Sequence, residues 1–545
     1  MPRSTASRSA DAIALDGSSL TLETFGRVVH ERVPCELARA ARQRVRKGRQ
    51  VIERALAGGE VIYGVNTGFG ELAQVRIDAD KLLVLQRNLV LSHAAGIGEP
   101  LPDAAVRGML LLRANTLARG HSGVRPEVVE ALLALLNHDL LPVIPSRGSV
   151  GASGDLAPLA HLALALIGRG VLRAGGGGGA AAGGAGVPMT AEEGLRRAGL
   201  APLELQAKEG LALINGTQAM TSLLALAALE ARRLLKVADL VGALSVDALR
   251  GTDCAFDPRI HALRPYPGQQ ASAANLWRLL QGSPIRESHR VGDVRVQDPY
   301  SIRCMPQVHG AVRDLLADVE AKLAIEINAV TDNPLVVELE PDPARASLAA
   351  GAEAGSAGGG GDAILSGGNF HGEPMALAAD VLAIGLAELG AISERRIEKL
   401  TNAAFSGLPP FLVRGAGLDS GFMIAHVTAA ALASENKGLA HPASVDSIPT
   451  SADKEDHVSM GMGAALKLGK VAANVRQVLA IELAAAAQGI DLLRPLTSSL
   501  PLEALHATVR ARIARWDEDR EMAPDLAAAE ELLRDGIDPH LQEML

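Results

Sequence analysis

The chain has 545 residues and a formal net charge of −9 at pH 7, and 48% of its residues are hydrophobic but only 2% aromatic. The acidic balance leaves no basic stripe for nucleic acid, and no segment reaches the ~20 uninterrupted apolar residues that span a membrane. With few aromatic residues the core is built from Ala, Leu, Val and Ile, which favours packed helices, and the length indicates several domain-sized units.

The chain begins with a segment that we expect to be a flexible tail. Residues 1–16 contain no apolar stretch long enough for a signal peptide. The three cysteines, Cys35, Cys254 and Cys304, lie far apart and show no redox or metal-binding spacing. We therefore expect a cytoplasmic protein without a metal.

A shaped loop interrupts the first helical region, which runs from Ser19 to about Gly59. The sequence VIYGVNTGFG (61–70) has three glycines in its last seven residues, which predicts a loop of defined conformation. Tyr63 is one of only three tyrosines in the chain. Taken alone, it is a packing residue with a hydrated hydroxyl, as most tyrosines are.

A predicted helix that begins near Lys81 turns into a loop by Gly98. Leu82, Leu85 and Leu89 share one face, and the pair Ser92-His93 lies at the end. A single histidine at a helix end ordinarily caps the helix or is solvated.

The most unusual stretch is GSVGASGDLAPLAH (148–161), which places Ala152, Ser153 and Gly154 together. Because Gly154 has no Cβ, its amide nitrogen can approach the carbonyl carbon of Ala152 and close a five-membered ring. Loss of water from that adduct and from Ser153 gives an imidazolone with an exocyclic methylene, an electrophile that needs no external cofactor. The simpler interpretation is a turn in which Ser153 or Asp155 caps a helix over 156–167.

Two segments rich in Gly and Ala, 174–186 and 341–362, bury too little apolar surface to order themselves and are predicted to be surface loops. Between them, Asn215 precedes a glycine in EGLALINGTQ (209–218) and is explained by helix termination alone. The sequence VQDPYSIR (296–303) ends in Arg303, which in a polar loop is ordinarily a solvated charge.

Three long helical tracts are predicted in the second half, over Gln307–Val330, Glu373–Leu400 and Ser459–Gln488. Helices of this length span about 36 to 45 Å and suit bundles that also meet partner subunits. Two intervening loops contain Phe370 and Glu455. Phe370 is explained equally well as a core residue, and Glu455 as an acid placed before a helix.

The stretch 148–161 resembles the signature of the aromatic amino acid ammonia-lyases, and the resemblance extends from about Leu20 to about Leu502 outside the two inserts. It implies that Ala152, Ser153 and Gly154 form a 4-methylidene-imidazol-5-one group autocatalytically. It also implies a mainly α fold, with a long-helix bundle of the aspartase/fumarase-like type over 211–545 and a smaller N-terminal domain over 17–210. A homotetramer with sites shared between subunits is expected.

The resemblance further implies roles for the other residues. In the family the equivalent tyrosine takes the β-proton of the substrate, so Tyr63 is the candidate general base. Arg303 and Asn215 bind the substrate carboxylate, because a planar two-pronged cation and an amide both donate to it. The remaining neighbours of the electrophile and substrate are Tyr300 on the ammonia-leaving side, Gln297 and Phe370.

Two positions indicate the substrate. Histidine-specific members of the family carry a Ser-His pair where this chain has Ser92-His93, and a carboxylate where it has Glu455. Phenylalanine enzymes have an apolar or mixed pair and an amide there. An imidazole ring needs hydrogen-bond partners that a phenyl ring leaves unpaired. The resemblance therefore implies elimination of ammonia from L-histidine to give trans-urocanate.

Two alternatives remain open. A phenylalanine or tyrosine ammonia-lyase, or an aminomutase, uses the same electrophile with a different pocket. A non-catalytic helical assembly protein keeps the bundle without needing Tyr63, Ser153, Asn215 and Arg303 together. Met305, His309 and Lys454 depart from the usual pattern near pocket residues, which bears on fine specificity.

Overall fold

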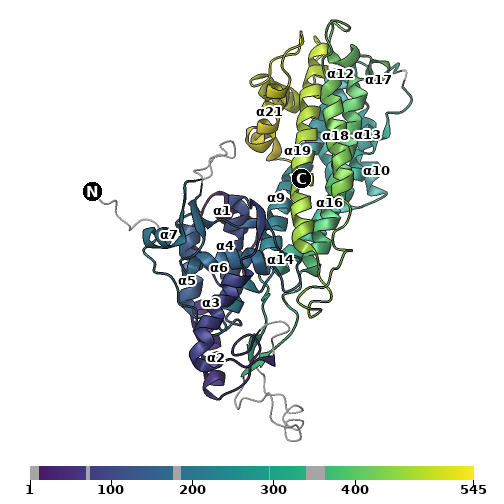
Figure 1. Cartoon of the computed structure of the whole chain (residues 1–545). Coiled ribbons are helices and arrows are strands. Elements are labelled where there is room, and N and C mark those ends of the chain that lie inside the picture. Colours follow the sequence, from purple (N-terminus) through teal and green to yellow (C-terminus); the bar gives the residue numbers. More distant parts are fainter. Residues whose placement is uncertain (1–11, 69–73, 176–185, 294, 339–361) are drawn as a thin grey trace. The chain divides into compact units, whose positions relative to one another are not determined.

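Four helices of 22 to 32 residues are the longest elements in the described part of the chain: α9 (Gln218–Ala248), α14 (Met305–Glu326), α16 (Glu373–Thr401) and α19 (Gly461–Leu492). They belong to a computed structural model that describes residues 12–68, 74–175, 186–293, 295–338 and 362–545 (Figure 1). The prediction of a mainly α fold with long packed helices is confirmed.

Contacts divide the chain into two units, and the division differs from the predicted one at 210/211. Unit 1 comprises Met1–Leu226, Ala321–Ala378 and Ala443–Leu466, and unit 2 comprises Ala227–Glu320, Ala379–Pro442 and Lys467–Leu545. Four of the five boundaries fall inside α9, α14, α16 and α19. A boundary inside a continuous helix leaves no glycine, proline or charge signal in the sequence, which explains the difference.

Unit 1 surrounds a buried helix with other helices and small sheets. Its helices are α1 (Leu22–His30), α2 (Arg39–Ala57), η2 (Ala79–Lys81), α3 (Leu82–His93), α4 (Asp103–Ala118), α5 (Pro126–Asn137), α6 (Leu156–Leu166), α7 (Ala191–Arg197) and α8 (Glu209–Ile214). Its strands are β1 (Ile13–Leu15), β2 (Cys35–Leu37), β3 (Ile97–Pro100), β4 (Leu140–Pro142), β5 (Pro145–Arg147), β6 (Val171–Ala174), β7 (Pro188–Thr190), β8 (Leu335–Glu338) and β9 (Asp362–Leu365).

The strands of unit 1 form four small sheets. β1 and β2 pair in parallel, β3 with β5 and β8 with β9 pair antiparallel, and β4, β6 and β7 form a three-stranded antiparallel sheet. The sequence predicts a flexible tail over 1–16, but residues 13–15 are strand β1, and Leu15 is buried. A strand this short is stabilised by partners about twenty residues away, which the local composition does not reveal.

Helix α4 is the centre of unit 1. Every residue from Ala105 to Ala118 is buried, and the helix packs against α1, α2 and α5. Its buried Arg107 is neutralised by Asp139, with 2.6 Å between Nη1 and Oδ1, and donates to the Val28 and Leu136 carbonyls. A buried guanidinium with all these partners ties α1 and α5 to the central helix.

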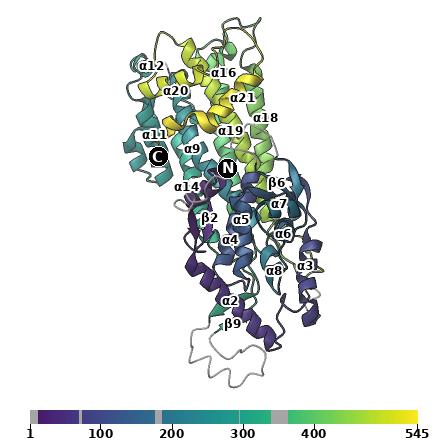
Figure 2. The ribbon, with the colours of Figure 1, turned by 90° about the vertical axis from the view of Figure 1, so that its left-hand side faces the viewer.

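Unit 2 contains a bundle in which α9, α16, α19 and α18 (Met423–Leu439) run side by side (Figures 1 and 2). The predicted stripes are confirmed: Leu382, Leu386 and Leu389 on α16, and Leu468, Val471, Val475 and Val478 on α19, are fully buried. The other elements of unit 2 are η3 (Asp253–Phe256), α10 (Pro258–Ala262), α11 (Pro267–Leu280), α12 (Pro284–Glu287), α13 (Tyr300–Arg303), α17 (Ala403–Ser406), η4 (Pro410–Leu412), α20 (Leu500–Arg510), α21 (Ala523–Glu531), η5 (Leu532–Gly536) and α22 (Asp538–Leu541).

Buried charges cross-link this bundle. Arg396 on α16 forms a two-pronged ion pair with Glu482 on α19, at 2.6 and 2.9 Å, and both side chains are fully buried. His309, one of the departures noted in the sequence, is also buried and lies 2.7 Å from Asp239. Removing one member of such a pair strands the other charge, so these contacts fix the register of the helices.

Helix α16 is also the one described helix that is long and apolar enough to cross a membrane. In its most apolar window 67% of the residues are buried inside the protein. Because its apolar face packs on other helices, α16 is accounted for as a core helix. Most of the predicted Gly/Ala-rich inserts, 176–185 and 341–361, lie outside the described residues.

Candidate active site

A cavity of about 910 Å³ opens in unit 1 and gathers most of the predicted site residues. Of the eleven residues singled out in the sequence, seven line it: Tyr63, His93, Ala152, Ser153, Asn215, Phe370 and Glu455. They come from segments as distant in sequence as the turn after α2 and the loop before α19. Gly154 follows directly in the loop that forms one wall.

The Ala-Ser-Gly loop is held in a conformation that requires glycine at its end. Gly154 has φ +70° and pairs with Gly216, whose carbonyl accepts from Asp155 N at 2.7 Å. A Cβ added to Gly154 would lie 2.2 Å from the Gly216 oxygen. A bulkier residue therefore fits neither the dihedral nor the space. Ala152 and Ser153 face the cavity beside this contact, so the three residues fit the imidazolone that the sequence predicts.

Asp155 stabilises the loop in a way that the sequence did not predict. It is the residue before α6, but its side chain caps α9: Oδ2 accepts from the N–H groups of Ala219 and Met220, each at 2.9 Å. Ser149 Oγ donates to the other oxygen at 2.9 Å. The carboxylate thus satisfies two free N–H groups of α9 and is favoured by its dipole. The expectation that Ser153 or Asp155 caps α6 through its side chain is wrong.

This buried carboxylate predicts a pH dependence. Burial raises the pKa of Asp155 to about 6 from an ordinary 3.8, although its three hydrogen bonds oppose the shift. Between those values the folded chain holds a proton that the unfolded chain has lost, so the free energy of unfolding falls as pH rises from about 4 to about 6, by about 3 kcal/mol in total.

We expect Asp155→Asn to remove this part of the slope in urea unfolding midpoints measured from pH 4 to pH 7. Asp78→Asn, at an exposed carboxylate paired with Lys81, is the control and should keep the wild-type slope. Parallel curves for wild type and Asp155→Asn would contradict the prediction.

Glu455 contacts the residue that the electrophile is made from. Its Oε1 accepts from Ser153 Oγ at 2.6 Å, and its Oε2 accepts from Thr450 at 2.7 Å and Ser451 at 2.9 Å. Two hydroxyls therefore orient the carboxylate while one of its oxygens points toward Ser153. A carboxylate held in this way accepts a hydrogen bond or a proton at the cavity wall.

His93 is the last residue of α3 and presents a neutral imidazole. Its Nδ1 lies 2.9 Å from the Leu89 carbonyl, which only accepts, so Nδ1 carries the proton. Burial lowers the pKa of His93, outweighing the Leu89 hydrogen bond and the nearby Glu455 charge. In the neutral ring Nε2 is then an acceptor, able to take a hydrogen bond from an N–H group of a ligand.

Tyr63 is carried by a turn whose own polar groups are satisfied. Asn66 accepts from Ile62 N at 2.8 Å and donates to the Glu60 carbonyl at 2.7 Å. Ile62 and Val65 pack into a hydrophobic cluster with α2 residues. Tyr63 itself is half-buried and lines the cavity. The predicted glycine-rich loop thus holds Tyr63 from a fixed turn, while residues 69–73 lie outside the described residues.

The three other predicted residues belong to unit 2 and do not line the cavity. Gln297 and Tyr300 are exposed, and the guanidinium of Arg303 stacks 4.5 Å from the Tyr300 ring centroid on α13. Arg303 Nε is buried without a hydrogen-bond partner among the described residues. The prediction that these residues contribute to the site stays a prediction.

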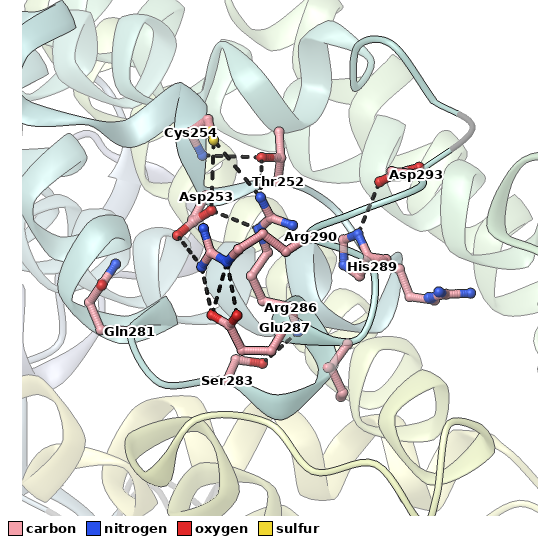
Figure 3. A network of polar contacts seen from close by, with 12 residues as sticks. Thr252, Asp253, Cys254, Gln281, Ser283, Arg286, Glu287, His289, Arg290 and Asp293 are labelled. Atoms are coloured by element: carbon pink, nitrogen blue, oxygen red, sulfur yellow. Dashed lines mark hydrogen bonds and ion pairs between the residues drawn. The ribbon is translucent and has the colours of Figure 1, made fainter.

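The loop before α13 is fixed by a polar network (Figure 3). Arg286 donates to Asp253 at 2.7 Å. The neighbouring Thr252 N donates to Asp298 Oδ2 at 2.7 Å. His289 is nearly buried and bonds Asp293 from the same loop. These contacts anchor the residue that follows Gln297, so the exposed side chains at the start of α13 project from a defined backbone.

Cavity residues that the sequence did not single out include Asn333 and His371. Asn333 belongs to a Thr-Asp-Asn-Pro run (331–334) that directly follows the predicted helix over Gln307–Val330, and His371 directly follows Phe370. Both residues lie beside segments that the sequence analysis used, and this position is the signal that could have identified them. Among the described residues, no group of three or more His, Cys, Asp or Glu side chains is arranged to hold a metal ion.

Long packed helices and an Ala-Ser-Gly turn in the wall of a cavity define a mainly helical lyase. The chain belongs to the aromatic amino acid lyase family, whose sequence profile matches residues 20–511. It is 53% identical over 530 residues to histidine ammonia-lyase of Anaeromyxobacter dehalogenans strain 2CP-C, covering 96% of this chain and 99% of that protein.

Solved structures agree. The histidine ammonia-lyase of Trypanosoma cruzi is 44% identical with a TM-score of 0.85, covering 98% of this chain and 96% of that one. Tyrosine aminomutase from Streptomyces globisporus is 37% identical with a TM-score of 0.86, covering 98% and 99%. The fold alone therefore does not separate the two activities, and the pocket residues have to.

Proposed function

We propose that this protein eliminates ammonia from L-histidine to give trans-urocanate. The observation that carries the proposal is one cavity in which the Ala-Ser-Gly loop lies with His93 and Glu455, a neutral imidazole acceptor and an oriented carboxylate. His93 can accept a hydrogen bond from an N–H group of the substrate imidazole, and Glu455 can pair with that ring when it is protonated. The similarity to histidine ammonia-lyases over nearly the whole chain supports the same reaction.

We infer that Ala152, Ser153 and Gly154 become the 4-methylidene-imidazol-5-one group. Once formed, this group supplies an electrophilic carbon that converts the amine of the substrate into a better leaving group. Gly154 provides the dihedral for ring closure, and the Gly216 carbonyl and Asp155 hold the loop in place. The family supports this assignment, and the direct evidence will be the subunit mass.

The side chains of the cavity then have separate tasks. Tyr63, which lies on a half-buried turn, removes the β-proton of the substrate. A base positioned in this way accelerates proton transfer about 10²- to 10⁴-fold. Asn215 donates to the substrate carboxylate. His93 and Glu455 hold the imidazole, and Phe370 packs against the substrate. Because burial lowers the pKa of His93, the residue is neutral at pH 7 and its Nε2 can accept a hydrogen bond from the substrate imidazole.

The assembly that we propose is a homotetramer with shared sites. We assign Gln297, Tyr300 and Arg303, which belong to unit 2, to such a shared site, as the resemblance to the family implies. Exposed apolar side chains on α16 (Leu377, Val381 and Ile384) and on α18 (Ile424 and Val427) offer surface for such contacts. We propose a cytoplasmic location, since a catabolic enzyme for a free amino acid works there.

A substrate panel tests the proposal. The protein is incubated with L-histidine, L-phenylalanine and L-tyrosine, and urocanate, cinnamate and coumarate are followed by ultraviolet absorbance while β-amino acids are followed by chromatography. We expect urocanate from L-histidine alone. Release of a β-amino acid would assign an aminomutase, cinnamate or coumarate another lyase, and no product from protein of the expected mass would exclude the reaction.

Replacing His93 with leucine tests the basis of this specificity. His93→Leu leaves the substrate N–H without an acceptor in a desolvated site, so we expect kcat/KM for L-histidine to fall about 10- to 100-fold. Turnover of L-phenylalanine should rise or stay constant. The control is His138→Leu, at the exposed C-terminal end of α5 and away from the cavity, which should retain wild-type kinetics. An unchanged kcat/KM for L-histidine in His93→Leu would contradict the assigned role.

A further inference from the structure

A buried ion pair lies behind the wall of the cavity. Lys208 Nζ lies 2.9 Å from each carboxylate oxygen of Asp332 and donates to the Asn333 carbonyl at 3.3 Å. Both side chains are completely buried. Taking two charges out of water costs several kcal/mol per ion, and well-packed apolar residues often stabilise a core better. Stability alone is therefore a weak explanation for this pair.

The pair is hydrogen-bonded to two residues that line the cavity. Asn333 N donates to Asp332 Oδ1 at 2.7 Å, and the Asn215 amide donates to the Asn333 carbonyl at 3.1 Å and more weakly to Asp332 at 3.5 Å. Because these neighbours only accept, the nitrogen of the Asn215 amide must face them. One Nδ2 hydrogen is used by the Asn333 carbonyl, and the second is left for a weak contact or a ligand.

A second buried cation adds to this arrangement. Arg113 is fully buried and donates through Nη1 to Gln218 at 2.7 Å and to the carbonyl of Asn215 at 3.2 Å. Its Nε and Nη2 have no hydrogen-bond partner among the described residues. Burial lowers the pKa of Arg113 to about 10, which leaves it charged at neutral pH. Arg113 and Lys208 both lie close enough to Asp332 to interact with its charge, so two buried cations share one carboxylate.

Lys208 occupies this place in a strained backbone conformation. It has φ +77°, in the left-handed region that residues other than glycine, asparagine and aspartate seldom adopt. Such strain costs on the order of 1 kcal/mol or more and persists where the surroundings demand it, commonly at functional sites. The backbone strain and the burial of the ion pair each raise the free energy of the folded state, and both occur at Lys208.

We propose that the Lys208–Asp332 pair positions the Asn215 amide for the carboxylate of the substrate, and that with Arg113 it makes this wall of the cavity selective for anionic ligands. The inference rests on the proposed function for the identity of the ligand. Lys208 and Asp332 are positioning residues, since they touch Asn215 and Asn333 and not the cavity. Asp332 and the Asn333 carbonyl pin the nitrogen of the amide, and the excess positive charge favours a ligand that brings a negative one.

The test compares two ligands that share an imidazole ring with a two-carbon chain and differ in the carboxylate, imidazole-4-propionate and 4-ethylimidazole, by calorimetry on the whole protein. We expect the wild type to bind the carboxylate ligand at least about tenfold more tightly, equal to about 1.4 kcal/mol. In Lys208→Met/Asp332→Asn, which removes both members of the ion pair together, we expect this preference to fall about tenfold while affinity for 4-ethylimidazole is kept. Lys81→Met/Asp78→Asn removes an exposed pair of the same chemistry and should leave the preference unchanged.

A second variant keeps the test valid if the double variant does not fold. Lys208→Arg keeps the charge, but a planar guanidinium cannot reproduce the ammonium contacts to both Asp332 oxygens and the Asn333 carbonyl. We expect a smaller loss of preference, and no further loss when it is added to Asn215→Ala, since the effect passes through that amide.

Each outcome decides one question. Lower thermal stability with an unchanged ligand preference would show a merely structural pair and overturn the inference, as would a wild type without preference for the carboxylate. A wild type that prefers the carboxylate ligand and loses that preference in the variants, but does not deaminate L-histidine, would overturn the proposed function and leave this inference standing.

Discussion

Ser153→Ala is expected to abolish the activity while leaving the fold intact. Without the Ser153 hydroxyl no exocyclic methylene forms, so the reaction loses its electrophile, and we expect kcat for L-histidine to fall by at least about 10³-fold. The wild-type subunit should have a mass about 36 Da below that of the encoded chain, the equivalent of two waters, and the variant should lack this deficit. Intact-protein mass spectrometry and urocanate formation measure the two effects.

The surroundings of Ser153 predict that this variant folds. The side chain gives up one hydrogen bond, to Glu455 Oε1, while Thr450 and Ser451 continue to hold the other oxygen of that carboxylate. Ser288→Ala is the control, because its hydroxyl bonds only the Ile285 carbonyl in unit 2. If Ser153→Ala turned over L-histidine within tenfold of the wild-type rate, the electrophile could not be made from this tripeptide.

The features that could be predicted from the sequence are those that depend on residues close together in the chain. The Ala-Ser-Gly loop was found because its chemistry depends on one residue without a Cβ, and Gly154 indeed has a positive φ. Helix α16 was predicted from leucine spacing within one residue of its observed end, because periodic burial is written along the helix itself. Seven of the residues that line the cavity of unit 1 were found through contiguous motifs.

Features that depend on distant partners were missed. The sequence predicts a helix through Val330, but α14 ends at Glu326. Beyond Glu326, the Asn115 amide donates to the Ile327 carbonyl at 2.8 Å. Asn328 accepts from Leu20 N and donates to the Leu20 carbonyl. Tertiary contacts satisfy the helix end in place of another turn. Helix α9, longer than α16, was also not among the three predicted long tracts.

The buried charges show the same limit more strongly. Asp155 reaches α9 at residues more than sixty positions away, and Lys208 meets Asp332 across 124 positions. A lone charged residue in a sequence is ordinarily solvated, so nothing local identifies it as buried. The buried charges behind the cavity could therefore be identified only from the structure, whereas seven of the residues that line the cavity were recognisable from their motifs.

Tyr63→Phe is expected to lower kcat for L-histidine by about 10²- to 10⁴-fold, the range for loss of a positioned general base. The ring is retained, and the turn that carries it depends on Asn66 and on the packing of Ile62 and Val65, so the geometry of the cavity should persist. KM should change little, because the carboxylate and imidazole contacts are made by other residues. A loss in kcat with constant KM is the signature of an interaction used in the transition state.

The matched control is Tyr266→Phe, which removes the same hydroxyl from an exposed tyrosine just before α11. Its kinetics and melting temperature should equal those of the wild type. Exchange of the β-hydrogen of L-histidine with deuterated solvent gives a second readout, since Tyr63→Phe should slow this exchange together with product formation. If exchange and turnover both survive in Tyr63→Phe, the proton is taken by another group, and Glu455, the carboxylate that Thr450 and Ser451 orient in the same cavity, becomes the base to test.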